Sequence, residues 1–171
     1  YNALQANYGP GLTGRRLIDG LQDPAWTNPA DWSPNRMFSK SWGWAAYPAE
    51  AVFSFYERMP ALVGGVTVVA PAAPSVELRD DPSTAPKEVE VWTSMDERPE
   101  HFVKAAAATL ETTPGEHPIT FAAREARFVK LRVLSGASQR VLEIAEVRVL
   151  EAARDGYIPL FTRAPGAHSW K

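Results

Sequence analysis

The sequence predicts an all-β fold built as a β-sandwich, and three observations support this. Charged and apolar residues alternate over residues 87–92 and again over 127–133, which is the pattern of a strand with one buried face. Turn-rich segments separate these runs from their neighbours, in a chain with 15 prolines and 11 glycines. Further short runs predict more strands, at residues 3–8, 52–55, 66–69 and 117–121.

Residues 101–110 fit a strand less clearly, because their run of alanines would also suit a helix. Pro99 and Pro114 flank the run, and predicted strands lie on both sides of it. We therefore expect an edge strand there.

The last predicted strand changes phase along its length. Leu142 and Ile144 share one face, whereas Val147 and Val149 have the opposite parity. This slip across residues 145–146 predicts a β-bulge, and bulges often re-aim a side chain near a site. A corner of the sheet without a function is the alternative interpretation.

Composition and charge limit the classes of partner. The 171 residues fit one domain, with 45% hydrophobic and 22% charged residues. The formal net charge of -2 is spread along the chain, so we expect neither a nucleic-acid surface nor docking on anionic lipid. The absence of cysteine excludes disulfides and thiolate metal sites. No apolar run approaches the roughly 20 residues of a membrane span.

The chain is expected to form a sandwich domain over residues 1–150, with a linker or docking arm at 151–171. Within the domain, residues 21–48 form a long insertion with little periodicity and many tryptophans. Long loops in compact domains are usually functional or disordered, and the aromatic content argues against disorder. We therefore expect this insertion to carry the site.

Sequence motifs give no sign of an enzyme. Residues 9–14 match GxGxxG, but no helix can follow because Asp19-Gly20 and Pro24 interrupt it. The three histidines are far apart in the sequence, and we expect them to be solvated. No pair of carboxylates stands out as an acid/base couple. The prediction is a non-catalytic protein.

Three segments of the chain resemble parts of a known family of binding domains. They are LIDG at 17–20 followed by Trp26, EVEVWTS at 88–94, and ARFVKLRV at 126–133 followed by LEIAEVRV at 142–149. Together they resemble the discoidin, or F5/8 type C, family, which includes family 32 carbohydrate-binding modules. The resemblance implies an eight-stranded jelly-roll β-sandwich, the galactose-binding-like fold, over residues 3–150.

Members of this family often hold a structural Ca²⁺ near the start of the fold. By motif match, the resemblance implies that Asp19 and Glu146 would be its side-chain ligands, with backbone carbonyls completing the shell. Pro24 departs from the usual continuation of the DG motif. In the alternative interpretation Asp19 caps a turn, and Glu146 is exposed or paired with an arginine.

In the family, ligands bind to loops at one end of the sandwich. Sugar-binding members stack an aromatic ring on a pyranose and bind its hydroxyls with polar side chains. The insertion supplies both kinds of group, which we expect to form the site: Trp26, Asp31, Trp32, Asn35, Arg36, Trp42 and Trp44. Alternatively, these tryptophans plug the end of the sandwich.

The expected function is therefore that of a binding module for poly- or oligosaccharide, within a larger extracytoplasmic protein of bacterial origin. A structural or protein–protein interaction domain in a cell-envelope assembly is the alternative. Insertion of Trp42 and Trp44 into a membrane is disfavoured because no basic cluster accompanies them.

Overall fold

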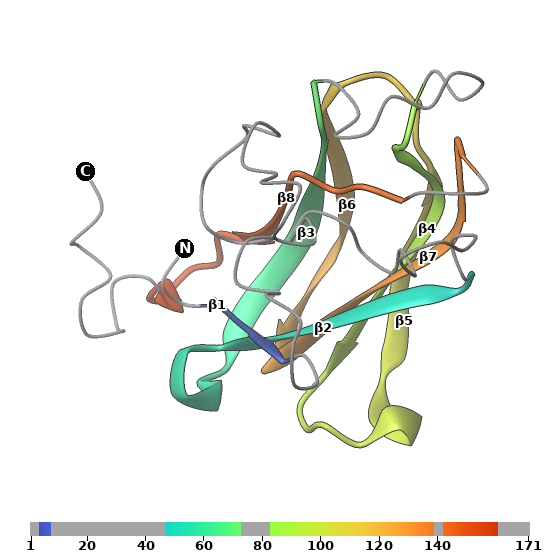
Figure 1. Cartoon of the computed structure of the whole chain (residues 1–171). Coiled ribbons are helices and arrows are strands. Elements are labelled where there is room, and N and C mark those ends of the chain that lie inside the picture. The colour runs from blue at the N-terminus through green and yellow to red at the C-terminus, as the bar shows by residue number, and fades with distance from the viewer. Residues whose placement is uncertain (1–3, 8–46, 73–82, 139–141, 161–171) are drawn as a thin grey trace.

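The computed structural model confirms the all-β prediction: its described residues form eight strands in two antiparallel sheets (Figure 1). The structure describes residues 4–7, 47–72, 83–138 and 142–160. Within these ranges, no helix has the length and apolarity that crossing a membrane would require.

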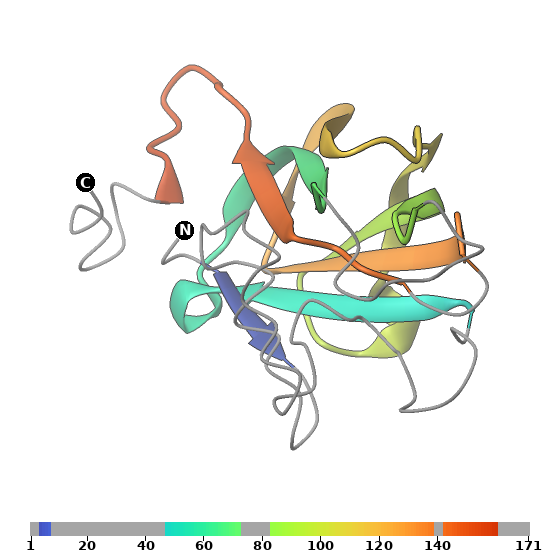
Figure 2. The same ribbon diagram turned by 45° about the horizontal axis from the view of Figure 1, so that its top comes forward.

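The larger sheet has five strands in the order β1-β2-β7-β4-β5, with bounds Leu4–Asn7, Ala49–Phe55, Phe128–Gly136, Pro86–Ser94 and Val103–Thr109. The smaller sheet has three strands in the order β6-β3-β8, with bounds Gly115–Ala126, Ala61–Ala70 and Glu146–Glu151. Two short 3₁₀ turns are η3 (Tyr56–Arg58) and η4 (Pro99–His101). Figure 2 shows β2 and β7 side by side, with the short β1 along the other edge of β2.

Apolar side chains from both sheets pack against one another in a single core. On β7, the alternate residues Val129, Leu131 and Val133 are fully buried, as their period-two pattern predicts. Full burial of such a side chain contributes about 1.5–3 kcal/mol. The edge position of β5 confirms the strand expected in residues 101–110.

Two details differ from the prediction. No register shift occurs across residues 145–146; instead the chain bends at Ala145 and β8 begins at the next residue. The phase change coincides with this bend, where Ala145 donates its N–H to the carbonyl of Val69 just before regular pairing starts. The register shift of the smaller sheet lies in β3, between Val63 and Gly65. In addition, β6 spans 12 residues, well beyond the short strand expected there.

Several connections meet at one end of the sandwich, which we call the insertion end because residues 8–46 join it. There β1 stops at Asn7 and β2 starts at Ala49. Backbone hydrogen bonds link the neighbouring chain segments at this end: Ala137 to Ala85, Glu143 to Thr84 and Ala145 to Val69. The opposite end carries the β2–β3 and β4–β5 connections, and Arg127 hydrogen-bonds to Phe55 and Ser94 there.

The first part of the expected arm packs against the sandwich. Ala152 donates its N–H to the carbonyl of Leu62, and the Tyr157 hydroxyl accepts from the N–H of Leu62 at 2.7 Å. Leu160 is buried in the hydrophobic core. The role of residues 151–171 as a linker or docking arm stays a prediction.

Candidate functional site

Asp19 lies outside the described residues. The same holds for all of the predicted ligand-binding residues: Trp26, Asp31, Trp32, Asn35, Arg36, Trp42 and Trp44. Of the predicted site residues, Glu146 lies within the described residues. Both strands that flank the segment 8–46 end at the insertion end, because Asn7 pairs with Val52 and Ala49 pairs with Val133. The described frame of the candidate site is therefore the insertion end.

Tyr47 fixes the point at which the segment enters β2. Its hydroxyl donates to the carbonyl of Ser138 at 3.1 Å, and its ring packs against the core. Gly136 makes room for it, since a Cβ at this position would overlap the Tyr47 hydroxyl. Burial raises the pKa of Tyr47, so the hydroxyl is a neutral donor at pH 7. The segment is thereby tied to the end of β7.

Two buried carboxylates lie at the same end of the sandwich, in the LEIAEVRV motif. Glu143 is 1% exposed and accepts a hydrogen bond of 2.6 Å from the hydroxyl of Thr84. A backbone bond between the same two residues, from Glu143 N to Thr84 O, is 2.9 Å long. This pair joins the start of β4 to the start of β8.

Glu146 is the more unusual carboxylate. It is fully buried, and Arg148 donates to its Oε2 at 3.1 Å. Its Oε1 is buried without a hydrogen-bond partner among the described residues. Arg148 also donates to Glu116 at 2.6 Å, and the bond to Glu146 raises the pKa of Arg148. A buried oxygen without a partner is costly unless something binds it.

A hard oxygen donor of this kind fits Ca²⁺, which takes carboxylate and carbonyl oxygens. In the described part of the chain, no group of three or more His, Cys, Asp or Glu residues could hold a metal. The pairing with Arg148 also agrees with the alternative interpretation of Glu146.

The two histidines within the described ranges hydrogen-bond to neighbouring residues. His101 Nδ1 lies 2.6 Å from Asp96 at the opposite end, and both side chains are about 40% exposed, at 39% and 40%. Arg98 and then His101 hold the pKa of the Asp96 carboxyl well below its usual range. In the described ranges, the hydrogen-bond partner of the His101 ring is therefore a carboxylate and not a hydroxyl. His117 bonds to the carbonyl of Thr113.

A polar network on the outer face of the larger sheet was not expected from the sequence. Glu90 accepts from Lys104 at 2.6 Å and from the indole of Trp92 at 3.0 Å, and Arg132 lies 3.5 Å away. Trp92 pairs across the sheet with Lys104 and Lys130, whose ammonium groups lie 5.4 and 5.2 Å from its ring centroid. These contacts give Trp92 a structural role within the sheet, as a cross-strand partner of two lysines. These contacts depend on which residues lie opposite one another in the sheet, so the alternation of the sequence alone could not predict them.

Similar solved structures are family 32 carbohydrate-binding modules. The module of NanJ from Clostridium perfringens, in complex with galactose, has a TM-score of 0.60 at 16% identity, over 85% of this chain and 92% of that chain. The module CpGH89CBM32-5 of the same organism, in complex with GalNAc-β-1,3-galactose, has a TM-score of 0.56 at 13% identity, over 86% and 94%. The module of AlyQ, in complex with 4,5-unsaturated mannuronic acid, has a TM-score of 0.53 at 17% identity, over 88% and 95%.

Sequence comparison alone does not find these relationships: no protein-family model matches the chain, and no curated protein is significantly similar to it. At such low identity the similarity establishes the fold. The chain thus has the galactose-binding-like β-sandwich fold of family 32 carbohydrate-binding modules, as the sequence resemblance implied.

Proposed function

We propose that this chain is a non-catalytic carbohydrate-binding module of a larger extracytoplasmic protein, which binds sugar through loops at the insertion end. The observation that carries the proposal is the fold, which the chain shares with modules solved with galactose, GalNAc-β-1,3-galactose or a mannuronic acid derivative. The flanking strands support it, because β1 stops and β2 starts at the insertion end, which is where the tryptophan-rich segment leaves and re-enters the described chain.

The chemistry of the segment suits a pyranose. Indole rings such as Trp32 and Trp42 would exclude water from the apolar face of the sugar. Asp31, Asn35 and Arg36 would hydrogen-bond its hydroxyls and fix its orientation.

A Ca²⁺ at the insertion end is part of the proposal. Glu146 would hold it through its buried Oε1, with Asp19 and backbone carbonyls as further ligands. The ion would supply positive charge that compensates the buried carboxylate, and it would tie the segment carrying Asp19 to the start of β8.

The test is a tryptophan fluorescence titration with galactose, GalNAc and acidic sugars. A Trp92→Phe background removes the indole in the larger sheet, so that the remaining fluorescence comes mainly from the tryptophans of the insertion. We expect a saturable change with one sugar class. We expect Trp32→Ala or Trp42→Ala to weaken binding more than about tenfold, as loss of an aromatic anchor does.

No response to any sugar, with a blue-shifted emission that a quencher does not affect, would overturn sugar binding at this end. The alternative is then a protein-interaction domain. It is supported by Ile158, which is 62% exposed between Tyr157 and Leu160, both of which contact the sandwich. Loss of partner binding after Ile158→Asp would support that alternative.

A further inference from the structure

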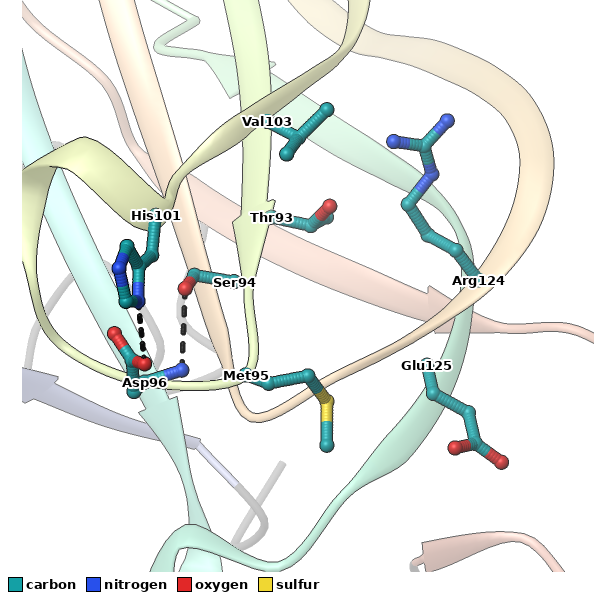
Figure 3. A pocket seen from close by; sticks show the side chains of 8 residues that line it. All are labelled: Thr93, Ser94, Met95, Asp96, His101, Val103, Arg124 and Glu125. Atoms are coloured by element: carbon teal, nitrogen blue, oxygen red, sulfur yellow. Dashed lines mark hydrogen bonds and ion pairs between the residues drawn. The ribbon is translucent and has the colours of Figure 1, made fainter.

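A concavity of about 320 Å³ opens at the opposite end of the sandwich, away from the insertion (Figure 3). It lies between the β4–β5 connection of the larger sheet and the C-terminal end of β6 in the smaller sheet. The lining residues are Thr93, Ser94, Met95, Asp96, His101, Val103, Arg124 and Glu125.

The register places three of these residues on the inner faces of the sheets. Directly paired residues point to the same face. Arg124 pairs with the fully buried Val63, and Thr93 pairs with both Val103 and the fully buried Val129. An inner-face valine would normally be buried, but Val103 is 60% exposed. The two sheets therefore leave their inner faces open to a ligand here.

Arg124 is the uncompensated charge of the concavity. It makes no hydrogen bond or ion pair with any residue that the structure describes. Its neighbour Glu125 points away from it in Figure 3 and lies 3.4 Å from Arg154. Asp96 at the rim is paired with Arg98 and His101. Each lining carboxylate thus has a cation of its own, and the guanidinium is left for an anion.

The apolar surface beside Arg124 limits the kind of anion. Figure 3 shows the Arg124 side chain extending to the level of Val103, with Thr93 below Val103 and Met95 farther down the drawing. Met95 is 46% exposed. The concavity therefore offers a guanidinium, a hydroxyl and two apolar side chains within one small volume, and a bare inorganic anion would use only the first two.

We propose that this concavity is a second binding site, for the carboxylate of a sugar acid. Arg124 would bind the carboxylate in a bidentate pair, and Val103 and Met95 would contact the apolar face of the ring. The choice of a sugar acid over other carboxylates rests on the proposed function. The site itself rests on its own geometry.

The methionines provide a probe that separates the two ends. The chain has three: Met95 in the concavity, Met59 packed against the core, and Met37 in the insertion. With ¹³C-methyl methionine labelling, galacturonate at constant ionic strength should shift the Met95 signal saturably in the millimolar range, while galactose should not. A response of Met37 alone would support the insertion site and overturn this one. A response of Met95 alone would support this site, and the insertion site would still be tested separately by the titration with galactose and GalNAc.

Two variants and one control test the contacts. Arg124→Gln should weaken the galacturonate response of Met95 by about tenfold or more, as loss of a charged hydrogen bond does. Val103→Asp should abolish the Met95 response, because the new carboxylate would repel that of galacturonate. Val103 is exposed, so the change should not disturb the core. Arg127→Gln makes the same charge change on an exposed residue three positions away and should leave the response unchanged.

Other results would overturn the proposal. A Met95 response equal for galacturonate and galactose, or unaffected by Arg124→Gln in a variant that unfolds at the wild-type temperature, would remove the carboxylate from the site. An equal response to acetate would reduce the site to one for simple anions. Silence of Met95 throughout the titration would remove the site.

Discussion

Glu90 and Glu146 are both buried glutamates on strands, and their surroundings differ in one respect. Glu90 is 7% exposed on the outer face of the larger sheet, and both of its oxygens have donors from Lys104, Trp92 or Arg132. Glu146 is fully buried at the start of β8, and one of its oxygens has no partner among the described residues.

This difference in hydrogen-bond partners indicates a structural role for Glu90, whereas Glu146 has an oxygen that could still accept a bond from a ligand. The donors of Glu90 come from β4, β5 and β7, so its network is complete within one sheet. A complete network stabilises the fold and leaves nothing for a ligand to bind. The incomplete shell of Glu146 lies at the start of β8, where the proposed Ca²⁺ would bind.

The largest effect should come from Ca²⁺ at Glu146. At a Ca²⁺ concentration of about 100 times Kd, we expect the free energy of unfolding to rise by about 2.7 kcal/mol, since only the folded chain holds the site. Glu146→Gln should remove this increase. The measurement is urea unfolding of both proteins with and without Ca²⁺.

A control distinguishes the metal from the ion pair. Glu116 is the exposed carboxylate on the other side of Arg148, so Glu116→Gln disturbs the same arginine. It should keep the full Ca²⁺ increment. If the wild type gains no stability with Ca²⁺, or Glu116→Gln loses the gain as well, Glu146 is a partner of Arg148 and nothing more.

The sequence predicted the strands of the core better than the polar sites. The alternation in residues 127–133 predicted which residues of β7 are buried, because that pattern is local. Burial of Glu90 could not be predicted, since its covering residues come from strands 14 and 42 positions away along the chain. The prediction made β6 too short, because its C-terminal half contains alanines and charged residues instead of an apolar run.

The candidate site shows the same limit. The resemblance in LEIAEVRV singled out Glu146, and the structure adds that the side chain is buried and that its Oε1 lacks a partner among the described residues. Arg124 gave no signal in the sequence, because an arginine between alanine and glutamate indicates a solvated strand face. Its inward direction follows only from the register opposite Val63.

A smaller effect is expected from breaking the complete network. Glu90→Gln keeps an acceptor but removes the charge from the bonds with Lys104 and Arg132. Charged hydrogen bonds contribute about 1.5–3 kcal/mol, and the partners here are partly exposed, so we expect a loss of about 1 kcal/mol. The loss should be the same with and without Ca²⁺ when measured by urea unfolding. A Ca²⁺-dependent loss would mean that the two carboxylates are not independent.

The smallest effect is the pH dependence of that loss. The hydrogen bond from Lys104 lowers the pKa of Glu90 below its usual value of 4.5. A lowered pKa in the folded state means that the stabilisation is complete above pH 4.5 and disappears as the pH falls through the folded pKa. The difference in unfolding free energy between wild type and Glu90→Gln should therefore be constant from about pH 5 to 7 and shrink in more acidic solution. Asp96 also has a lowered pKa, but it is unchanged in the variant and cancels in the difference. A difference that persists through acid unfolding would show that Glu90 acts through packing or hydrogen-bond geometry and that its charge contributes little.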